Sequence, residues 1–293
     1  MTDICCIGHI TRDRIITQEP PNTVHCAGGS AYYMAWAFQA LPRDVDFHLV
    51  TSVSREVMPE VEKLRLAGVR VTAFESPDNV FFENKYGRNM DHRQQRVLAK
   101  SAPFTLAQLE NVEARVFHLG TLLADDFAPE VVELLATKGD VSIDVQGYMR
   151  YVDGEQVRST EWPDKLRLLK HTAILKVNEF EYQSLTGLAD ARDAALQIHD
   201  WGVREVIITL GGGGSLVYAE GRFYQTPAYA PRRLVDATGC GDTYSAGYLY
   251  ARSLGMGYAE SSRFAAAMCT LKLEHTGPFD RSIDDVRQIM SGK

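Results

Sequence analysis

Short apolar runs that suit buried strands recur along this chain, and helix-like stretches lie between most of them. The apolar runs are Ile4–Ile7, Phe47–Val50, Val116–Leu119, Val141–Asp144, Ala173–Val177 and Val206–Thr209. The helix-like stretches are Pro59–Ala67, a segment with a Thr-x-x-Gln capping box at Thr105, Pro129–Thr137 and Asp190–Trp201. This alternation predicts an α/β fold, with a three-layer αβα core around a mainly parallel sheet. Ligands of such sheets bind beyond the carboxyl ends of the strands.

One part of the chain departs from this alternation. Val80–Tyr86 and Arg93–Ala99 both have extended character and are joined by a short polar segment, which predicts a β-hairpin. Two further short strands are predicted at Arg14–Thr17 and Thr23–Cys26. These strands would form either a small second sheet that serves as a lid over a site, or an edge extension of the main sheet.

Charge and apolar content argue against several classes of protein. The formal net charge of -7 does not suggest a polyanion-binding surface, so we expect no nucleic-acid partner. No apolar stretch approaches the roughly 20 residues of a membrane span, and Asp3 stands where a signal peptide would carry basic residues. Five cysteines without a CxxC motif predict reduced thiols, with Cys5 and Cys6 on opposite faces of a strand. We therefore expect a cytoplasmic protein with no membrane partner.

The segment Leu234–Tyr250, LVDATGCGDTYSAGYLY, carries the strongest chemical signal. We expect a short strand that ends near Asp236, a tight turn at Gly239-Cys240-Gly241, and a helix from about Asp242. Glycines let a backbone approach a ligand closely, and the first N–H groups of a helix attract an anion. The turn is therefore a candidate cradle for a phosphoryl group.

Asp242 has two explanations at this position. A carboxylate beside a phosphoryl group can orient an acceptor hydroxyl and take its proton during transfer. Alternatively, Asp242 is an ordinary N-cap. A dinucleotide-binding turn is disfavoured because Tyr244 stands where that motif has Gly or Ala, and no GxxxxGK[ST] motif occurs.

The stretch DATGCGD, residues 236–242, followed by a helix of small residues resembles the C-terminal signature of the ribokinase-like (PfkB) carbohydrate kinases. The resemblance implies that Asp242 is the catalytic base. It also implies that the amides of Gly239, Cys240 and Gly241 form the anion hole.

Two features near the N-terminus resemble the same family. Gly28-Gly29 opens a helix where the family brings a substrate close to backbone amides, and Asp13 stands where the family binds substrate hydroxyls. Taken alone, the first is a simple helix start and the second an exposed turn residue. Many members have an Asn at the position of Tyr33, so the sequence departs from ribokinases and fructokinases there.

Features on the nucleotide side are also similar to the family. Asn178 and Glu181 match its Asn-x-x-Glu motif, which helps to hold Mg²⁺ through water, although both residues also suit a helix start. The segment TLGGGGS, residues 209–215, matches a glycine-rich segment that borders the nucleotide, although a plain flexible turn explains it equally. The cofactor-binding residues implied in this way are Asn178, Glu181, Thr209, Gly211, Gly212, Gly214 and Gly277.

The resemblance implies a core of nine or so strands with a small β-lid. We expect a single domain over residues 1–293, with lid segments at about 11–27 and 79–100. The implied activity is transfer of a phosphoryl group from ATP, with Mg²⁺, to a hydroxyl of a small sugar or polyol. A monovalent cation such as K⁺ is an additional expected cofactor, in the segment Glu274–Gly277.

The acceptor itself is less strongly indicated. The candidate substrate residues are Asp13, Gly28, Gly29, Asn84, Gln146 and Arg150. Arg88, Arg93 and Arg96 are further hairpin candidates for which a solvated charge is the simpler explanation. The stretch IDVQGYMR and the missing Asn look closer to the inositol-kinase-like members, which makes myo-inositol, another cyclitol or a nucleoside the alternative acceptor.

Three functions stay open at this point: a kinase, a non-enzymatic ligand sensor on the same fold, and a nicotinamide oxidoreductase. An intact Asp242 and the pair Asn178 and Glu181 favour the kinase. A homodimer through the lid is a further expectation, with Phe81 or Phe82 as exposed apolar contacts.

Overall fold

The computed structural model describes residues 1–18, 21–86 and 93–292. Within these residues the main sheet has nine strands, in the order β15-β14-β13-β12-β9-β8-β1-β4-β5. The strands are β1 (Thr2–Gly8), β4 (Phe47–Val53), β5 (Arg70–Glu75), β8 (Ala114–Gly120), β9 (Asp140–Asp144), β12 (Ile174–Asn178), β13 (Glu205–Thr209), β14 (Ser215–Ala219) and β15 (Arg222–Thr226). Neighbouring strands among these pair in parallel, except that β14 pairs in antiparallel fashion with both β13 and β15. The predicted, mainly parallel sheet is therefore confirmed.

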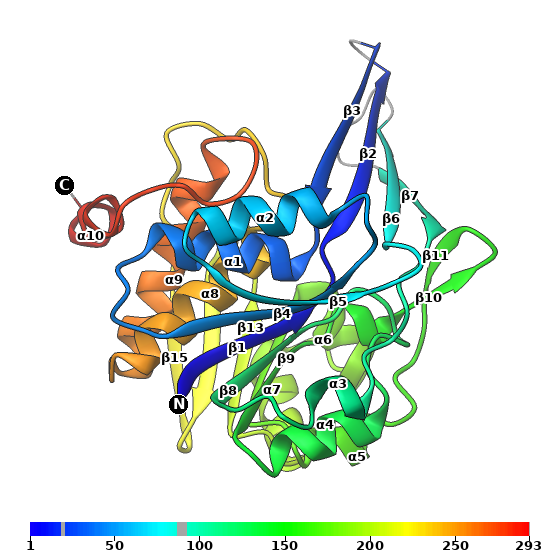
Figure 1. Cartoon of the computed structure of the whole chain (residues 1–293). Helices are drawn as coiled ribbons and strands as arrows, with labels where there is room; N and C mark the ends of the chain where they lie inside the picture. Colours follow the sequence, from blue (N-terminus) through cyan, green and yellow to red (C-terminus); the bar gives the residue numbers. More distant parts are fainter. Residues whose placement is uncertain (19–20, 87–92, 293) are drawn as a thin grey trace.

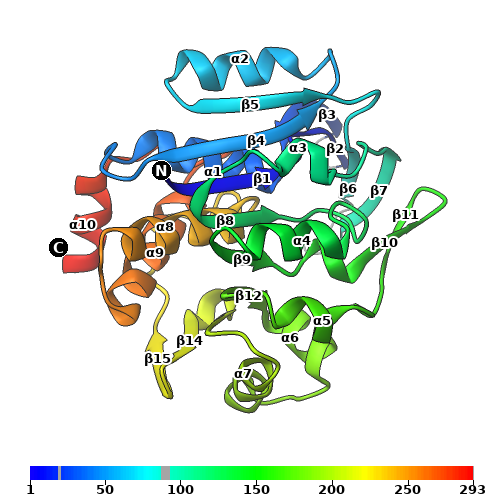
Figure 2. The same cartoon turned by 60° about the horizontal axis from the view of Figure 1, so that its bottom comes forward.

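Helices cover both faces of this sheet, as Figures 1 and 2 show. One face packs against α1 (Ser30–Ala40), α2 (Met58–Leu66), α8 (Cys240–Ser253), α9 (Tyr258–Leu273) and α10 (Ile283–Ser291). The other packs against α3 (Leu106–Leu109), α4 (Pro129–Ala136), α5 (Lys165–Leu169), α6 (Glu179–Thr186) and α7 (Ala191–Asp200). Cys6 lies in the first apolar cluster and Cys5 in the second, as strand alternation predicts.

Local signals in the sequence explain where several helices start and stop. Thr105 and Gln108 form the predicted capping box at the start of α3. Gly68 and Gly202, just beyond α2 and α7, have φ values of 88° and 117°, which a side chain would strain. The predicted stretches Pro59–Ala67 and Asp190–Trp201 agree with the bounds of α2 and α7 within one residue.

A second sheet of six strands, counted over the described residues, stands beside the first, in the order β10-β11-β7-β6-β2-β3. Its strands are β2 (Thr11–Gln18), β3 (Pro21–Gly28), β6 (Phe81–Tyr86), β7 (Arg93–Ala99), β10 (Arg150–Asp153) and β11 (Gln156–Ser159). In Figure 1, β2 and β3 extend beyond the main sheet and its helices. The predicted hairpin pairs β6 with β7, and the predicted short strands pair as β2 and β3.

Two expectations about this second sheet need correction. The hairpin of β10 and β11 was missed, although Asp153-Gly154 is a recognised hairpin signal and Gly154 has φ 62°. Phe82 is not exposed: it is buried with Val80, Val97 and Leu122 beneath the sheet. Phe82 is thus unsuited to a contact between two copies of the chain, because the sheet needs it to pack against the main body.

Candidate active site

The segment before α8 was expected to contain a short strand that ends near Asp236, and this expectation was wrong. Residues 227–238 form no strand near Asp236. Instead, the Val235 N–H donates to the Leu273 carbonyl at the end of α9 (2.8 Å), so the backbone finds its partner on a helix end rather than in a sheet. The loop therefore reaches the turn supported by α9.

Gly239 is the N-cap of α8 and has φ 77°. A Cβ at this position would overlap the Tyr33 ring, so the close approach of α1 as well as the backbone conformation requires glycine. Tyr33, at the position where many family members have Asn, thus packs directly against the predicted anion hole.

Asp242 lies in the first turn of α8, three residues after the N-cap. The N-cap explanation for Asp242 is therefore wrong, because Gly239 occupies that position. The Cys240 N–H donates to the Ala237 carbonyl (3.2 Å). The amides of Gly241 and Asp242 follow, in the turn where a helix supplies no carbonyl partner.

The electrostatics around Asp242 favour proton uptake. Burial raises the pKa of Asp242, and the charge of Asp144 raises it further. The Ser30 hydroxyl, Lys176 and Arg150 act in the opposite direction. A carboxyl whose pKa is raised in this way is a better base than a solvated aspartate.

A buried ion pair that the sequence analysis missed lies beside this turn. Lys176 in β12 and Asp144 at the end of β9 are register partners, and the Nζ–Oδ2 distance is 2.6 Å. Burial works against the charge of Asp144, but the ammonium holds the pKa of Asp144 below its usual range. A Cβ on Gly241 would lie 3.2 Å from Lys176 Nζ, so the ammonium reaches the predicted anion hole. The signal was a lysine inside the apolar run ILKV, because an unpaired lysine is rarely buried.

Asn178 and Glu181 lie at the start of α6, where they form a capping box. Asn178 Oδ1 accepts from the Phe180 and Glu181 N–H groups, and Glu181 Oε2 accepts from the Asn178 N–H (2.8 Å). Burial and the charge of Asp144 raise the pKa of Glu181. The helix-start explanation is thus confirmed for both residues, and it leaves them at the carboxyl end of β12, next to the Lys176 pair.

The glycines of the turn between β13 and β14 differ in the space around them. A Cβ on Gly214 would overlap the Thr226 carbonyl of β15, so the sheet itself requires glycine there. No atom of the described residues lies within 4 Å of a Cβ on Gly212, and only the Glu179 carboxylate lies within 4 Å of one on Gly211. Thr209, at the end of β13, donates weakly to the Val177 carbonyl (3.4 Å).

Asp13 and Asn84 lie on one face of the second sheet. The register pairs Asp13 with Phe82 and Ile15 with Asn84, which places the residues at 13, 15, 82 and 84 on the same side. Thr11 Oγ1 donates to Asp13 Oδ1 (2.7 Å), and Gln95 Nε2 donates to the Oδ1 of the buried Asn84 (3.0 Å).

The Gly28-Gly29 turn borders the same face. A Cβ on Gly28 would lie 2.6 Å from Asp13 Oδ2, so only glycine lets the turn approach this carboxylate. Gly29, the N-cap of α1, has φ 91°.

The remaining predicted residues fall into four groups. Arg150, the first residue of β10, is close enough to lower the pKa of both Asp242 and Glu181, and the Gln146 N–H donates to Asp144 Oδ1 (3.2 Å). Gly277 follows α9 with φ 91°. Arg96 forms ion pairs with Glu83 and Glu155, both 2.7 Å, so its role is structural. Arg88 and the side chain of Arg93 lie outside the described residues.

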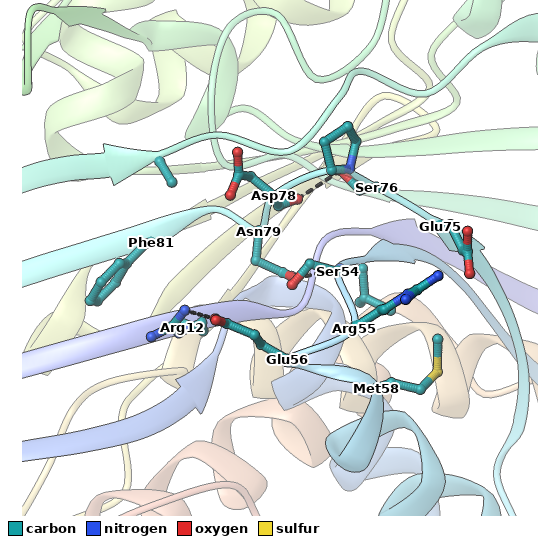
Figure 3. A pocket seen from close by; sticks show the side chains of 13 residues that line it. Arg12, Ser54, Arg55, Glu56, Met58, Glu75, Ser76, Asp78, Asn79 and Phe81 are labelled. Carbon is teal, nitrogen blue, oxygen red and sulfur yellow. Dashed lines mark hydrogen bonds and ion pairs between the residues drawn. The ribbon is translucent and has the colours of Figure 1, made fainter.

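A hollow of about 570 Å³ lies on the opposite side of β2. Figure 3 shows Arg12 in this hollow, paired with Glu56 and next to Phe81. Because side chains alternate along a strand, Arg12 faces away from Asp13. This hollow is therefore separate from the predicted site. A second hollow, of about 530 Å³, is lined by Arg150 and Gln95 together with β11.

Within the part of the chain that the structure describes, no group of three or more His, Cys, Asp or Glu side chains is arranged to hold a metal ion by itself. The same part contains no helix that is long and apolar enough to cross a membrane.

Several known proteins with a similar sequence or structure are kinases. The chain is 27% identical to the cytidine kinase of Thermococcus kodakarensis over 90% of this chain and 93% of that one. A pyrophosphate-dependent kinase in the ribokinase family, solved with a pyrophosphate analog and myo-inositol, is 27% identical, with a TM-score of 0.86 over 97% of this chain and 99% of that one. Ribokinase from Arabidopsis thaliana, solved with ribose and ATP, shares the fold, with a TM-score of 0.79 over 99% of each chain at 20% identity.

The sequence profile of the pfkB family carbohydrate kinases matches residues 78–284. This range includes the capping box of Asn178 and Glu181, the glycine-rich turn after β13 and the turn that carries Asp242. The chain belongs to the PfkB family of carbohydrate kinases.

Proposed function

We propose that this kinase transfers the terminal phosphoryl group of ATP to a hydroxyl of a small sugar or polyol, with Asp242 as the base. The observation that carries the proposal is the position of Asp242. Its carboxylate lies in the first turn of α8, beside the amides of Gly241 and Asp242, with its pKa raised by burial and by Asp144. A site that only held a phosphate would gain nothing from a carboxylate there.

The chemistry follows from this arrangement. The acceptor hydroxyl gives its proton to Asp242 as its oxygen bonds to the terminal phosphorus, and the bond from that phosphorus to the bridging oxygen of ADP breaks. The N–H groups of Gly239, Gly241 and Asp242 would stabilise charge on the transferring oxygens, whereas the Cys240 N–H already donates to the Ala237 carbonyl. Lys176, whose ammonium lies next to Gly241, would add a cation on the same side.

The donor side fits ATP with Mg²⁺. Mg²⁺ prefers oxygen ligands and keeps several waters, and Asn178 and Glu181 supply amide and carboxylate oxygens at the end of β12. Because burial and Asp144 disfavour the charge on Glu181, a nearby divalent cation would relieve an existing electrostatic cost. The ion would neutralise charge on the donor phosphates. Gly211 and Gly212 would border the nucleotide, and Gly277 is a further donor-side proposal.

The acceptor side fits neutral hydroxyls. Asp13, the Gly28-Gly29 turn and Asn84 would bind them, with Gln146 and Arg150 at the carboxyl end of β9. The second sheet would act as the lid. An inositol-like cyclitol and a nucleoside are the acceptors favoured by the relatives, because one 27% identical neighbour was solved with myo-inositol and another relative is a cytidine kinase.

Pyrophosphate is a second candidate donor. The observation in its favour is the similarity to the pyrophosphate-dependent kinase, which extends over 97% of this chain. Either donor presents a phosphoryl group to the same turn, so the role of Asp242 does not change.

A panel assay tests the proposal. Purified protein with Mg²⁺ and either ATP or pyrophosphate is offered myo-inositol, other cyclitols, ribose, fructose and nucleosides, while release of ADP or phosphate is followed. We expect one acceptor class to give turnover. Donor binding by calorimetry without turnover on any acceptor would favour the sensor instead, and the absence of any donor binding would contradict the proposal.

Two further expectations remain proposals. We propose a cytoplasmic location, and we propose that two copies pair through the second sheet. β3 lies at the edge of that sheet and its residues 21–26 are exposed, including Val24.

A further inference from the structure

Lys272, in the last turn of α9, is fully buried, with 0% of its side chain exposed. Its Nζ donates to the carbonyls of Asp236 (3.0 Å) and His275 (3.2 Å) and lies 3.5 Å from the Asp236 carboxylate. A buried ammonium is costly unless its donors are satisfied, and here two carbonyls accept hydrogen bonds while the Asp236 carboxylate balances the charge.

These oxygens come from two segments that no sheet holds together. Asp236 lies in the loop that leads into the turn of Asp242, and His275 lies in the loop after α9. Further bonds join the same segments: the Arg232 N–H donates to Glu274 Oε1 (2.7 Å), and Arg233 Nε donates to the Glu274 carbonyl (3.0 Å). Lys272 is the cation at the centre of this junction.

The oxygen set around Lys272 Nζ is of the kind that binds a monovalent cation. Backbone carbonyls can replace the hydration shell of K⁺, and a carboxylate balances its charge. The charge of Lys272 also reaches the catalytic turn: burial raises the pKa of Cys240 to about 12, and Lys272 opposes that rise.

We propose that Lys272 is a positioning residue that serves as a built-in monovalent cation for the 236–242 segment, so that the enzyme does not depend on K⁺. The proposal concerns the turn of Asp242 and rests on the proposed function of that turn. It replaces the expected K⁺ near Gly277 with an ammonium from the chain itself.

Two variants separate a positioning cation from a merely structural side chain. Lys272→Ala removes the ammonium and leaves space, whereas Lys272→Met removes the charge and fills the space. We expect both to lose about 10-fold or more in kcat, with a smaller change in KM. K⁺ or NH₄⁺ should restore part of the activity of Lys272→Ala, tetramethylammonium should not, and no cation should restore Lys272→Met. Lys63→Ala, at an exposed position in the last turn of α2, is the matched control.

Thermal unfolding gives a second readout that does not need turnover. The melting temperature of the wild type should be the same in K⁺ and in tetramethylammonium, whereas that of Lys272→Ala should rise when K⁺ is added. A wild type that requires K⁺, or a Lys272→Ala variant that is fully active without K⁺ or shows no response to any cation, would overturn the proposal. If no donor and acceptor give turnover, the proposed function fails, while the unfolding experiment still decides the role of Lys272.

Discussion

The two buried lysines near the turn of Asp242 differ in their partners. Lys176 is 7% exposed and lies among carboxylates: Asp144 pairs with it directly, and the charges of Glu181 and Asp242 reach it. Burial opposes its charge, but these groups together raise the pKa of Lys176. Lys272 is 0% exposed and is held mainly by backbone carbonyls.

The difference indicates two uses of the same side chain. An ammonium among carboxylates, next to Gly241, is placed to meet an anionic group. An ammonium among carbonyls, next to Asp236, is placed to hold a backbone. Loss of Lys176 should therefore change the chemistry and its pH dependence, whereas loss of Lys272 should change the order of the loop.

Lys176→Met should have the larger effect on the rate. Without the ammonium, the transferring phosphoryl group loses a cation and Asp144 is left as an unpaired buried charge, so kcat should fall by roughly 10²–10³-fold. Steady-state kinetics would measure this, with Lys170→Met, at the exposed end of α5, as the control. Activity within twofold of the wild type would remove Lys176 from the site.

The pH dependence should separate the two lysines next. Because the pKa of Asp242 is raised, activity should be lost as pH falls through a value above the ordinary aspartate pKa of about 3.9. Lys176 lowers the pKa of Asp242, so this acid limb should move to higher pH in Lys176→Met and stay in place in Lys272→Met. Profiles of kcat/KM against pH would measure this shift. If activity fell at the same pH in both variants, the proposed difference between the two lysines would be contradicted.

Gly239→Ala should shift the turn of Asp242 relative to both lysines. We expect it to have a smaller effect than the loss of Lys176, and to appear first in the free energy of unfolding. The new Cβ meets the Tyr33 ring and also forces a side chain into φ 77°. Gly187→Ala, just after α6, is a matched control, because Gly187 has φ 76° and open space around its Cβ position. We expect Gly239→Ala to lower the free energy of unfolding by about 1–3 kcal/mol more than Gly187→Ala in denaturant titrations. Equal losses would show that only the backbone conformation matters.

The sequence was sufficient for the parts of the fold that depend on local pattern. Apolar runs and capping signals located the parallel strands other than β5, and the helices α2, α3, α4 and α7, because these elements are set by neighbouring residues along the chain. The hairpin of β10 and β11 was missed because its strands have four residues each and are largely polar. The strand expected near Asp236 was wrong because Leu273 on α9, distant in sequence, accepts its backbone bond.

The residues of the candidate site also separate into those that local sequence could suggest and those that depend on partners distant in the chain. Asp242, Asn178 and Glu181 could be proposed from the sequence because each belongs to a short motif whose spacing is fixed by a turn or a helix start. Lys176 and Lys272 could not be, since a buried lysine becomes meaningful only when its partners from other elements are known. Tyr33 was noticed as a departure from the family pattern, but its packing on Gly239 required the structure.

The most direct test of the central claim is transfer of labelled terminal phosphate from ATP or pyrophosphate to the acceptor found in the panel, by the wild type and by Asp242→Asn. Asp193→Asn is the control. Asp193 lies three residues after the N-cap of α7, as Asp242 does in α8, and it is not part of the candidate site. We expect Asp242→Asn to lose roughly 10²–10⁴-fold in rate while still binding donor and acceptor, and Asp193→Asn to match the wild type. An Asp242→Asn variant that transfers phosphate within a few-fold of the wild-type rate would show that another group takes the proton.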